Sequence, residues 1–311
     1  MSHSIPVVGT PDDRLSAREA LPVIALTVVL AVLIGLSLGL LGGGGSILTV
    51  PLLVYVTGLP AKEAIALSLL VVGVTSAAAA VSHARAGRVQ WRTGILFGLA
   101  GMVGAYAGGR LAELIPGRVL LLAFAVMMVA TAVAMLRGRK DVDPDAAPRR
   151  LPLGRILLDG TVVGLVTGLV GAGGGFLVVP ALALLGGLPM PVAVGTSLVV
   201  IAMKSAAGFA GYLASVQIDW TLAAMVTAAA VVGSVLGGRL VSRVHPEHLR
   251  KGFGWFVLVM ATVILGQELG WLVGGVAAAL VAGAAVVVVL RGRRRRPAPA
   301  AAPAEPVASE R

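Results

Sequence analysis

One lysine lies deep inside an apolar stretch of the sequence. Lys204 falls within residues 192–213 and precedes Tyr212 by eight residues, about 12 Å of helix at roughly 1.5 Å per residue. If this stretch spans a membrane, the ammonium group is far from the interface. A charge at such depth marks a functional position by default. Lys204 is therefore predicted to pair with an anionic substrate or a coupling carboxylate; the alternative is a structural pair or a lysine that reaches the interface.

Hydroxyl side chains share this stretch with Lys204. Thr196, Ser197 and Ser205 lie in it, and Ser68 occupies a similar position in an earlier apolar stretch. A hydroxyl can donate a hydrogen bond to an oxyanion. It can equally bond back to a carbonyl of its own helix. The sequence leaves both roles open for each of the four.

Two glycine runs are the third candidate feature. Each is followed by an apolar segment of about ten residues, too short to cross a bilayer and therefore predicted to be a half-helix. The N-terminus of such a helix exposes backbone N–H groups and a positive dipole end, which favour an anion. The alternative is that the glycines only pack helices closely. The candidate substrate-binding residues here are Gly43, Gly44, Gly45 and Ser46 in the first run and Gly173, Gly174 and Gly175 in the second.

The composition shows what kind of elements must position these residues. Of the 311 residues, 58% are hydrophobic and 13% charged, whereas soluble domains are roughly half apolar and a quarter charged. Several apolar runs are near or above the ~18 residues needed to cross hydrocarbon. The sequence therefore predicts an all-α, multi-pass membrane protein in a lipid bilayer. The longest runs cover residues 21–41, 65–81, 119–136 and 269–290.

The same composition excludes several classes of function. The chain has no cysteine, which removes thiolate metal sites and cysteine nucleophiles. No His or acidic residue lies in mid-span beside a serine, so we predict no enzyme, no metal site and no cofactor. The net charge of +11 is concentrated in short loops and the C-terminal tail, where it predicts membrane orientation rather than nucleic-acid binding.

An internal duplication organises the chain. Residues recur at an offset of 129, the difference between positions 220 and 91, without a gap. Tryptophan, arginine and proline at one fixed register are not expected by chance in an Ala/Val/Gly-rich protein. The pattern is typical of a repeat architecture. Matching pairs include Gly35 with Gly164, Gly39 with Gly168, Pro51 with Pro180, Trp91 with Trp220 and Arg110 with Arg239.

The loops indicate opposite orientations for the two halves. Arg85, Arg88 and Arg92 surround Trp91, whereas the equivalent loop at Trp220 has no basic residue. Because basic loops are cytoplasmic, these equivalent loops are predicted to face opposite sides. Inverted-topology repeats, each opening with a glycine-broken helix pair, follow. The C-terminus is then cytoplasmic and the N-terminus external.

This scheme divides the chain into six parts. They are a polar N-terminal segment (1–20), a first transmembrane repeat (21–137), a cytoplasmic linker (138–155), a second transmembrane repeat (156–267), a final transmembrane helix (268–290) and a basic, Pro/Ala-rich disordered tail (291–311). GxxxG spacings predict close helix contacts inside the protein or between copies, so a homo-oligomer remains open. These spacings are Gly94 with Gly98, Gly104 with Gly108 and Gly233 with Gly237.

The doubled glycine-rich openings, the Thr196-Ser197-Leu198 motif, the loop from His83 to Trp91 and the Ile218-Asp219-Trp220 echo together resemble the TauE/SafE family of sulfite exporter-like permeases. The resemblance covers roughly residues 23–267. It implies a bacterial-type plasma-membrane transporter for sulfite or related organosulfur anions. The first repeat reads Leu67-Ser68-Leu69 in place of the threonine motif, so symmetric ligation by Thr196 and its counterpart does not follow.

The residues and the resemblance both lead to one function. We expect a secondary transporter of a small anion, sulfite or an organosulfonate, which works as an exporter by alternating access of two inverted repeats. A gradient, for example of H+ or Na+, or the membrane potential would supply the driving force. The alternatives are a permease or channel for another small solute or a cation, which would favour acidic residues or carbonyl rings in its pore, and a membrane scaffold that transports nothing.

Overall fold

The computed structural model describes residues 11–41, 44–137, 153–171, 173–180, 188–240 and 246–270, with the single residues 182, 275 and 283. All regular secondary structure in these residues is helical, which confirms the predicted all-α class. The first half contains α1 (Pro11–Leu41), η1 (Gly44–Leu48), α2 (Thr49–Tyr55), α3 (Ala61–Arg85), α4 (Trp91–Leu111), η2 (Ala112–Leu114) and α5 (Gly117–Arg137). The second half contains α6 (Leu153–Val170), α7 (Gly175–Pro180), α8 (Met190–Tyr212), α9 (Trp220–Leu240) and α10 (Pro246–Leu269).

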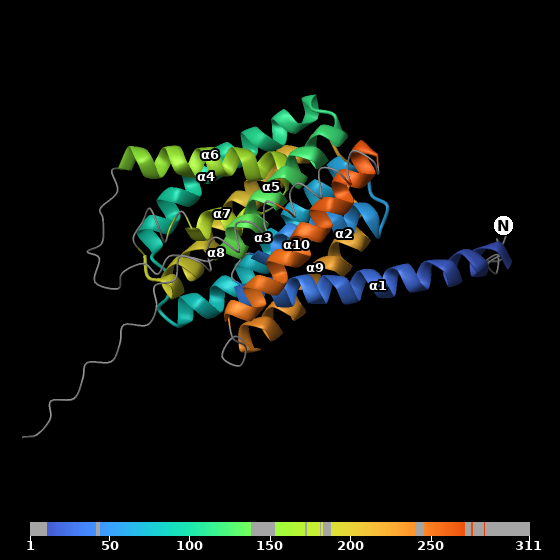
Figure 1. The fold of residues 1–311 in the computed structure, drawn as a ribbon, viewed down its shortest axis with the longest axis horizontal. Helices are drawn as coiled ribbons and strands as arrows, with labels where there is room; N and C mark the ends of the chain where they lie inside the picture. Colours follow the sequence, from blue (N-terminus) through green and yellow to red (C-terminus); the bar gives the residue numbers. More distant parts are fainter. Residues whose placement is uncertain are drawn as a thin grey trace, which may run out of the picture.

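Four helices in the described part of the chain are long and apolar enough to cross a membrane. They cover Ala61–Arg85, Trp91–Leu114, Pro191–Tyr212 and Trp220–Gly238. Shorter apolar helices accompany them, including Ile24–Gly39 and Ser46–Tyr55. The predicted C-terminal tail, most of the linker and nearly all of the final span lie outside the described residues. Helix α1 begins at Pro11, so part of the polar N-terminal segment continues the first apolar helix outward (Figure 1).

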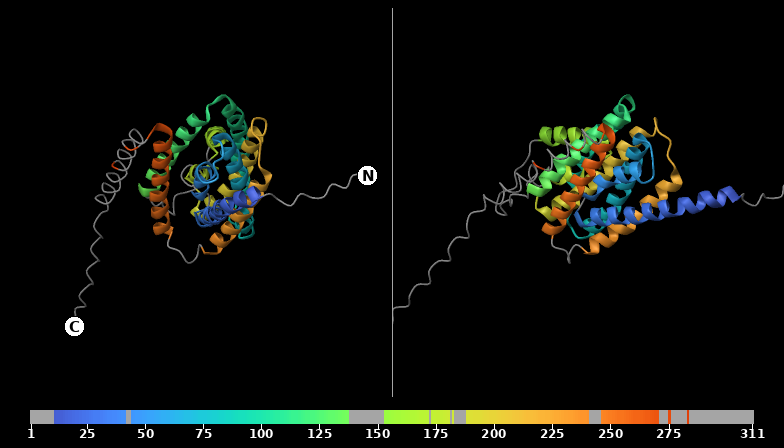
Figure 2. Two further views of the ribbon diagram at one scale, coloured as in Figure 1. Left: turned by 90° about the vertical axis from the view of Figure 1, so that its right-hand side faces the viewer. Right: turned by 45° about the vertical axis from the view of Figure 1, so that its right-hand side comes forward.

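The duplication reappears in the helix bounds. Helix α4 covers Trp91–Leu111 and α9 covers Trp220–Leu240. Both helices are 21 residues long, and both of their bounds differ by the offset of 129. The opening helices are exchanged between the halves, because α1 packs chiefly on α9 and α6 packs chiefly on α4. Figures 1 and 2 show α1 lying along α9, with its N-terminal part projecting beyond the other helices. The opening helix of each half therefore packs against a helix of the other half.

Contacts between helices fix their relative directions. A Cβ atom on Gly233 would lie 2.1 Å from the carbonyl oxygen of Val32, and one on Gly237 would lie 2.3 Å from that of Leu36, so α1 and α9 run parallel. The equivalent helices α3 and α8 run antiparallel, because Gly73 faces Ser205 while Leu69 faces Gly208. They are the central pair of the bundle.

Small residues bring the exchanged helices into backbone contact. A Cβ atom on Gly104 would lie 2.1 Å from the carbonyl oxygen of Thr161, and one on Gly164 would lie 2.2 Å from that of Gly101. Larger side chains would force α4 and α6 apart. The spacing from Gly104 to Gly108 and from Gly233 to Gly237 thus serves contacts within one chain.

Gly104→Ala is expected to destabilise the protein. The added methyl group would clash with backbone, which cannot move aside as a flexible side chain can, and overpacking costs about 1–3 kcal/mol. The thermal midpoint of the purified protein should fall. Gly238→Ala is the matched control on α9, because a Cβ atom there has nothing within 4 Å, and its midpoint should equal or exceed the wild-type value.

Candidate functional site

Lys204 is a fully buried cation near the centre of the bundle. Its side chain is 1% exposed, and its Nζ donates a hydrogen bond to Oγ1 of Thr167 on α6 at 2.9 Å. The aliphatic part of the side chain passes Gly101 of α4, where a Cβ atom would lie 3.6 Å from the Cβ of Lys204. None of the ion pairs formed by the described residues includes Lys204. The ammonium group therefore has a hydroxyl partner but no carboxylate in that part of the chain.

The second glycine run lies directly against this ammonium group. A Cβ atom on Gly174 would lie 2.2 Å from the Nζ of Lys204 and 2.3 Å from the Cγ2 of Thr167. The φ of Gly174 is +65°, a left-handed conformation that glycine adopts most readily. Both space and conformation require glycine here. As a result, irregular backbone comes into contact with a buried cation.

The first glycine run meets the second at the same place. Ser46 in η1 is fully buried, and a Cβ atom on Gly173 would lie 3.3 Å from its Oγ and 2.3 Å from Cγ1 of Val72. On the other side of this run, Ser68 of α3 donates a hydrogen bond to the carbonyl oxygen of Gly171 at 2.9 Å. The breaks in the two repeats are thus neighbours. Irregular backbone inside a membrane requires such enclosure by protein.

Other candidate residues have separate contacts. Thr196 Oγ1 accepts a hydrogen bond from the backbone N–H of Gln90 at 2.9 Å, which joins the start of α8 to the start of α4. Ser197 Oγ donates to the carbonyl oxygen of Val194 at 2.7 Å, the back-bonding alternative. Ser205 faces α3 rather than α6. Of the glycines, Gly44 and Gly45 begin η1, Gly175 begins α7, and Gly43 lies outside the described residues.

Thr167 is the contact that the sequence did not single out. Its own hydroxyl hydrogen can go to the carbonyl oxygen of Val163 at 2.7 Å, which leaves a lone pair for Lys204. Threonine back-bonding is ordinary in helices, so the residue type carried no signal. The repeat offset pairs Thr167 with Leu38, and that difference in polarity is the signal that was available.

Thr167→Val is expected to lower both stability and transport, because valine keeps the shape but removes the acceptor of Lys204. Leaving a buried ammonium group without its partner costs about 1–3 kcal/mol or more. Thermal unfolding of the purified protein measures the loss. Thr167→Ser keeps the acceptor and is expected to retain most of the stability; a stable Thr167→Val beside a destabilised Thr167→Ser would show that the methyl group, not the hydroxyl, matters.

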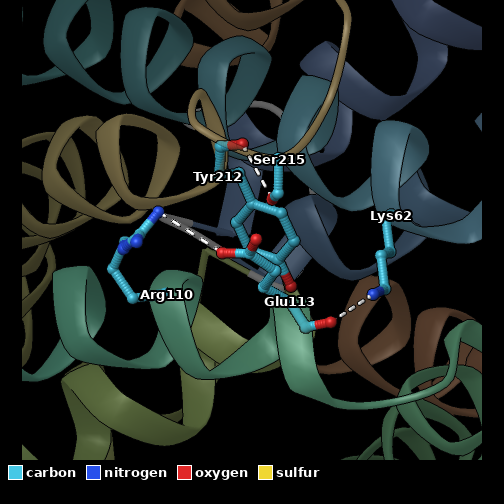
Figure 3. Close-up of polar contacts among 5 residues, drawn as sticks. All are labelled: Lys62, Arg110, Glu113, Tyr212 and Ser215. Atoms are coloured by element: carbon cyan, nitrogen blue, oxygen red, sulfur yellow. Dashed lines mark hydrogen bonds and ion pairs between the residues drawn. The ribbon is translucent and has the colours of Figure 1, made fainter.

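A polar cluster lies at the end of the bundle where α8 ends (Figure 3). The hydroxyl of Tyr212 donates to the carbonyl oxygen of Leu169 at 2.6 Å. Arg110 forms an ion pair with Glu113 at 3.4 Å, and Lys62 Nζ donates to the carbonyl oxygen of Glu113 at 2.8 Å. A surface pocket of about 440 Å³ opens beside it, lined partly by Lys62, Glu63 and Ser215. The residues in these contacts come from α3, α4, η2, α6 and α8.

The described residues include no group of three or more His, Asp or Glu side chains that could hold a metal ion. The groups that meet at the site are the ammonium of Lys204, the hydroxyl of Thr167 and the backbone at Gly174.

Comparisons with known proteins agree with a transport function. The model of a family described as "Sulfite exporter TauE/SafE" matches residues 27–264. A "Probable membrane transporter protein" of Xylella fastidiosa is 35% identical over 247 residues, 78% of this chain and 94% of its own length. A protein of the same description from Methanocaldococcus jannaschii is 27% identical over 80% of this chain and 94% of its own. No solved structure matches the chain.

Proposed function

Because the chain belongs to the TauE/SafE sulfite exporter family of membrane transporters, we propose that it carries a small oxyanion, sulfite or an organosulfonate, out of the cell by alternating access. The chain is a multi-pass membrane transporter rather than an enzyme. The proposal also places the protein in the plasma membrane with its C-terminus in the cytoplasm.

The environment of Lys204 is the observation that favours an anionic substrate. A buried positive charge is costly inside a membrane and is normally compensated. In the described residues its side chain bonds to Thr167 and faces Gly174, with no carboxylate paired to it. An oxyanion would supply the missing negative charge, and charge-assisted hydrogen bonds to such a group are short and strong. A cation would instead be repelled from this position.

The packing of the two halves supports alternating access. Antiparallel α3 and α8, which are repeat equivalents, favour an inverted relation between the halves. Inverted repeats in transporters hold the substrate near the midplane and move against each other. Lys204 and both glycine breaks lie where the halves meet, so relative movement would change which side reaches the site.

Two equivalent seams join the halves, the contact of α4 with α8 and the contact of α3 with α9, and they differ in how tightly they are packed. At the seam of α4 with α8, a Cβ atom on Gly109 would lie 2.6 Å from the carbonyl oxygen of Gly208. At the seam of α3 with α9, the equivalent Gly238 has nothing within 4 Å. There, an apolar groove of about 560 Å³ is lined in part by Val74, Ala223 and Thr227. One tight and one loose seam support the proposal, because a single state of such a cycle is asymmetric.

The test is flux through proteoliposomes that contain only this protein. Vesicles loaded with unlabelled anion should accumulate radiolabelled sulfite or organosulfonate by saturable exchange under imposed H+ or Na+ gradients. Unlabelled sulfite should compete, whereas potassium or sodium should not be carried in its place. Flux that never saturates would indicate a channel, selective cation flux would reverse the proposed charge, and no flux of any solute would leave the scaffold alternative.

A further inference from the structure

The two central helices are in contact near repeat-equivalent residues. A Cβ atom on Gly73 of α3 would lie 3.4 Å from the Cβ of Ser205 and 3.9 Å from the carbonyl oxygen of Ala202 on α8. Gly73 and Ala202 differ by the repeat offset of 129. Helices α3 and α8 therefore meet at equivalent positions of the two repeats.

A pair of equivalent serines flanks this crossing. Ser76 and Ser205 also differ by the repeat offset, and both side chains are 0% exposed. Ser76 is three residues beyond Gly73, so the two share one side of α3, the side that faces Ser205. One hydroxyl thus comes from each half of the protein.

Neither hydroxyl has a hydrogen-bond partner among the described residues. Thr75 and Ser234, two other buried hydroxyls of the long helices, bond back to their own helix, Thr75 to Val71 at 2.6 Å and Ser234 to Val231 at 3.0 Å. A buried hydroxyl without a partner is destabilising, because it has lost its hydrogen bonds to water. Ser76 and Ser205 therefore each have a hydroxyl hydrogen to donate, at equivalent positions of the two repeats.

We propose that Ser76 and Ser205 are substrate-binding residues that donate their hydroxyl hydrogens to oxygen atoms of the transported oxyanion. The inference rests on the proposed function. Lys204, whose side chain leaves α8 beside Ser205 and reaches Thr167 of α6, would neutralise the charge of the anion, while the serines hold its oxygens from both halves. An anion held in this way would couple the halves, because it bonds to α3 of one and α8 of the other.

The test measures sulfite binding to the purified, full-length protein from its thermal stability over a range of sulfite concentrations. Ser76→Ala and Ser205→Ala are each expected to weaken the apparent Kd by about tenfold or more, the loss expected for a hydrogen bond to a charged group. Without sulfite, both variants should melt at or above the wild-type temperature, because each loses an unsatisfied hydroxyl. Ser234→Ala, which removes a buried hydroxyl bonded to its own helix, should bind sulfite as the wild type does.

The outcomes separate this inference from the proposed function. Wild-type Kd values in both serine variants would overturn the role of the hydroxyls and point to an ordered water as their partner, while leaving anion transport intact. If sulfite and organosulfonates neither stabilise nor pass through the wild-type protein, the proposed function itself fails.

Discussion

Lys204→Met is expected to abolish saturable anion flux and at the same time to raise the thermal stability of the protein. Methionine is close to lysine in length and keeps the packing of the aliphatic chain against Gly101, but it carries no charge. Removing one partner of a buried, hydrogen-bonded charge pair costs about 2–5 kcal/mol of binding, roughly thirtyfold to several thousandfold in affinity. Without substrate the same charge is a burden, so its removal should stabilise the fold by about 1 kcal/mol or more.

Opposite changes in function and stability distinguish a binding residue from a structural one. Flux of labelled sulfite and the thermal midpoint would be measured on the same preparations. Lys62→Met is the matched control, because Lys62 is only partly buried and donates to a backbone carbonyl; we expect it to keep wild-type flux. A Lys204→Met protein that melts earlier but still transports would show that the lysine serves the fold.

Gly174→Ala is expected to reduce flux by at least about tenfold, and Gly174→Leu to abolish it. Even one methyl group would lie 2.2 Å from the Nζ of Lys204, so the ammonium group or the backbone must move. Overpacking costs about 1–3 kcal/mol, and the left-handed conformation adds about 1–2 kcal/mol for any residue with a Cβ. Initial rates of sulfite exchange, normalised to reconstituted protein, measure the effect.

Gly87→Ala separates crowding from conformational strain. Gly87 has a similar φ of +67°, but a Cβ atom there has nothing within 4 Å. Alanine at this position would have the conformational strain without the clash, so we expect a modest loss of stability and normal flux. Equal loss of flux in Gly87→Ala and Gly174→Ala would mean that strain, and not the contact with Lys204, explains the result.

The sequence was sufficient for the parts of the fold that depend on periodicity and register. The offset between Trp91 and Trp220 anticipated the matching bounds of α4 and α9, and the glycine runs anticipated the breaks before α2 and α7. These features are local or repeated, so one chain contains the information. The outward extension of α1 to Pro11 was not anticipated, because polarity ends a membrane span but does not end a helix.

The candidate site could be predicted only in part, because partner choice depends on tertiary packing. Lys204 was evident as a charge in an apolar stretch, but its contact with Thr167 required the approach of α6 to α8. The hydroxyls of Thr196, Ser197 and Ser205 looked alike in the sequence; the structure gives them a loop partner, a partner in the same helix and no partner. Their roles in binding substrate remain predictions.

The most direct test of the central claim is chemical restoration of the charge at position 204. The chain has no native cysteine, so Lys204→Cys carries the only thiol and can be alkylated with bromoethylamine, which creates a thioether analogue of lysine. Intact mass would confirm the modification, and iodoacetamide would give a neutral adduct of similar size. We expect sulfite flux to be absent in the cysteine variant, restored by the aminoethyl group and absent with the neutral adduct. Equal flux with the two fully formed adducts would contradict a substrate-binding cation at this position.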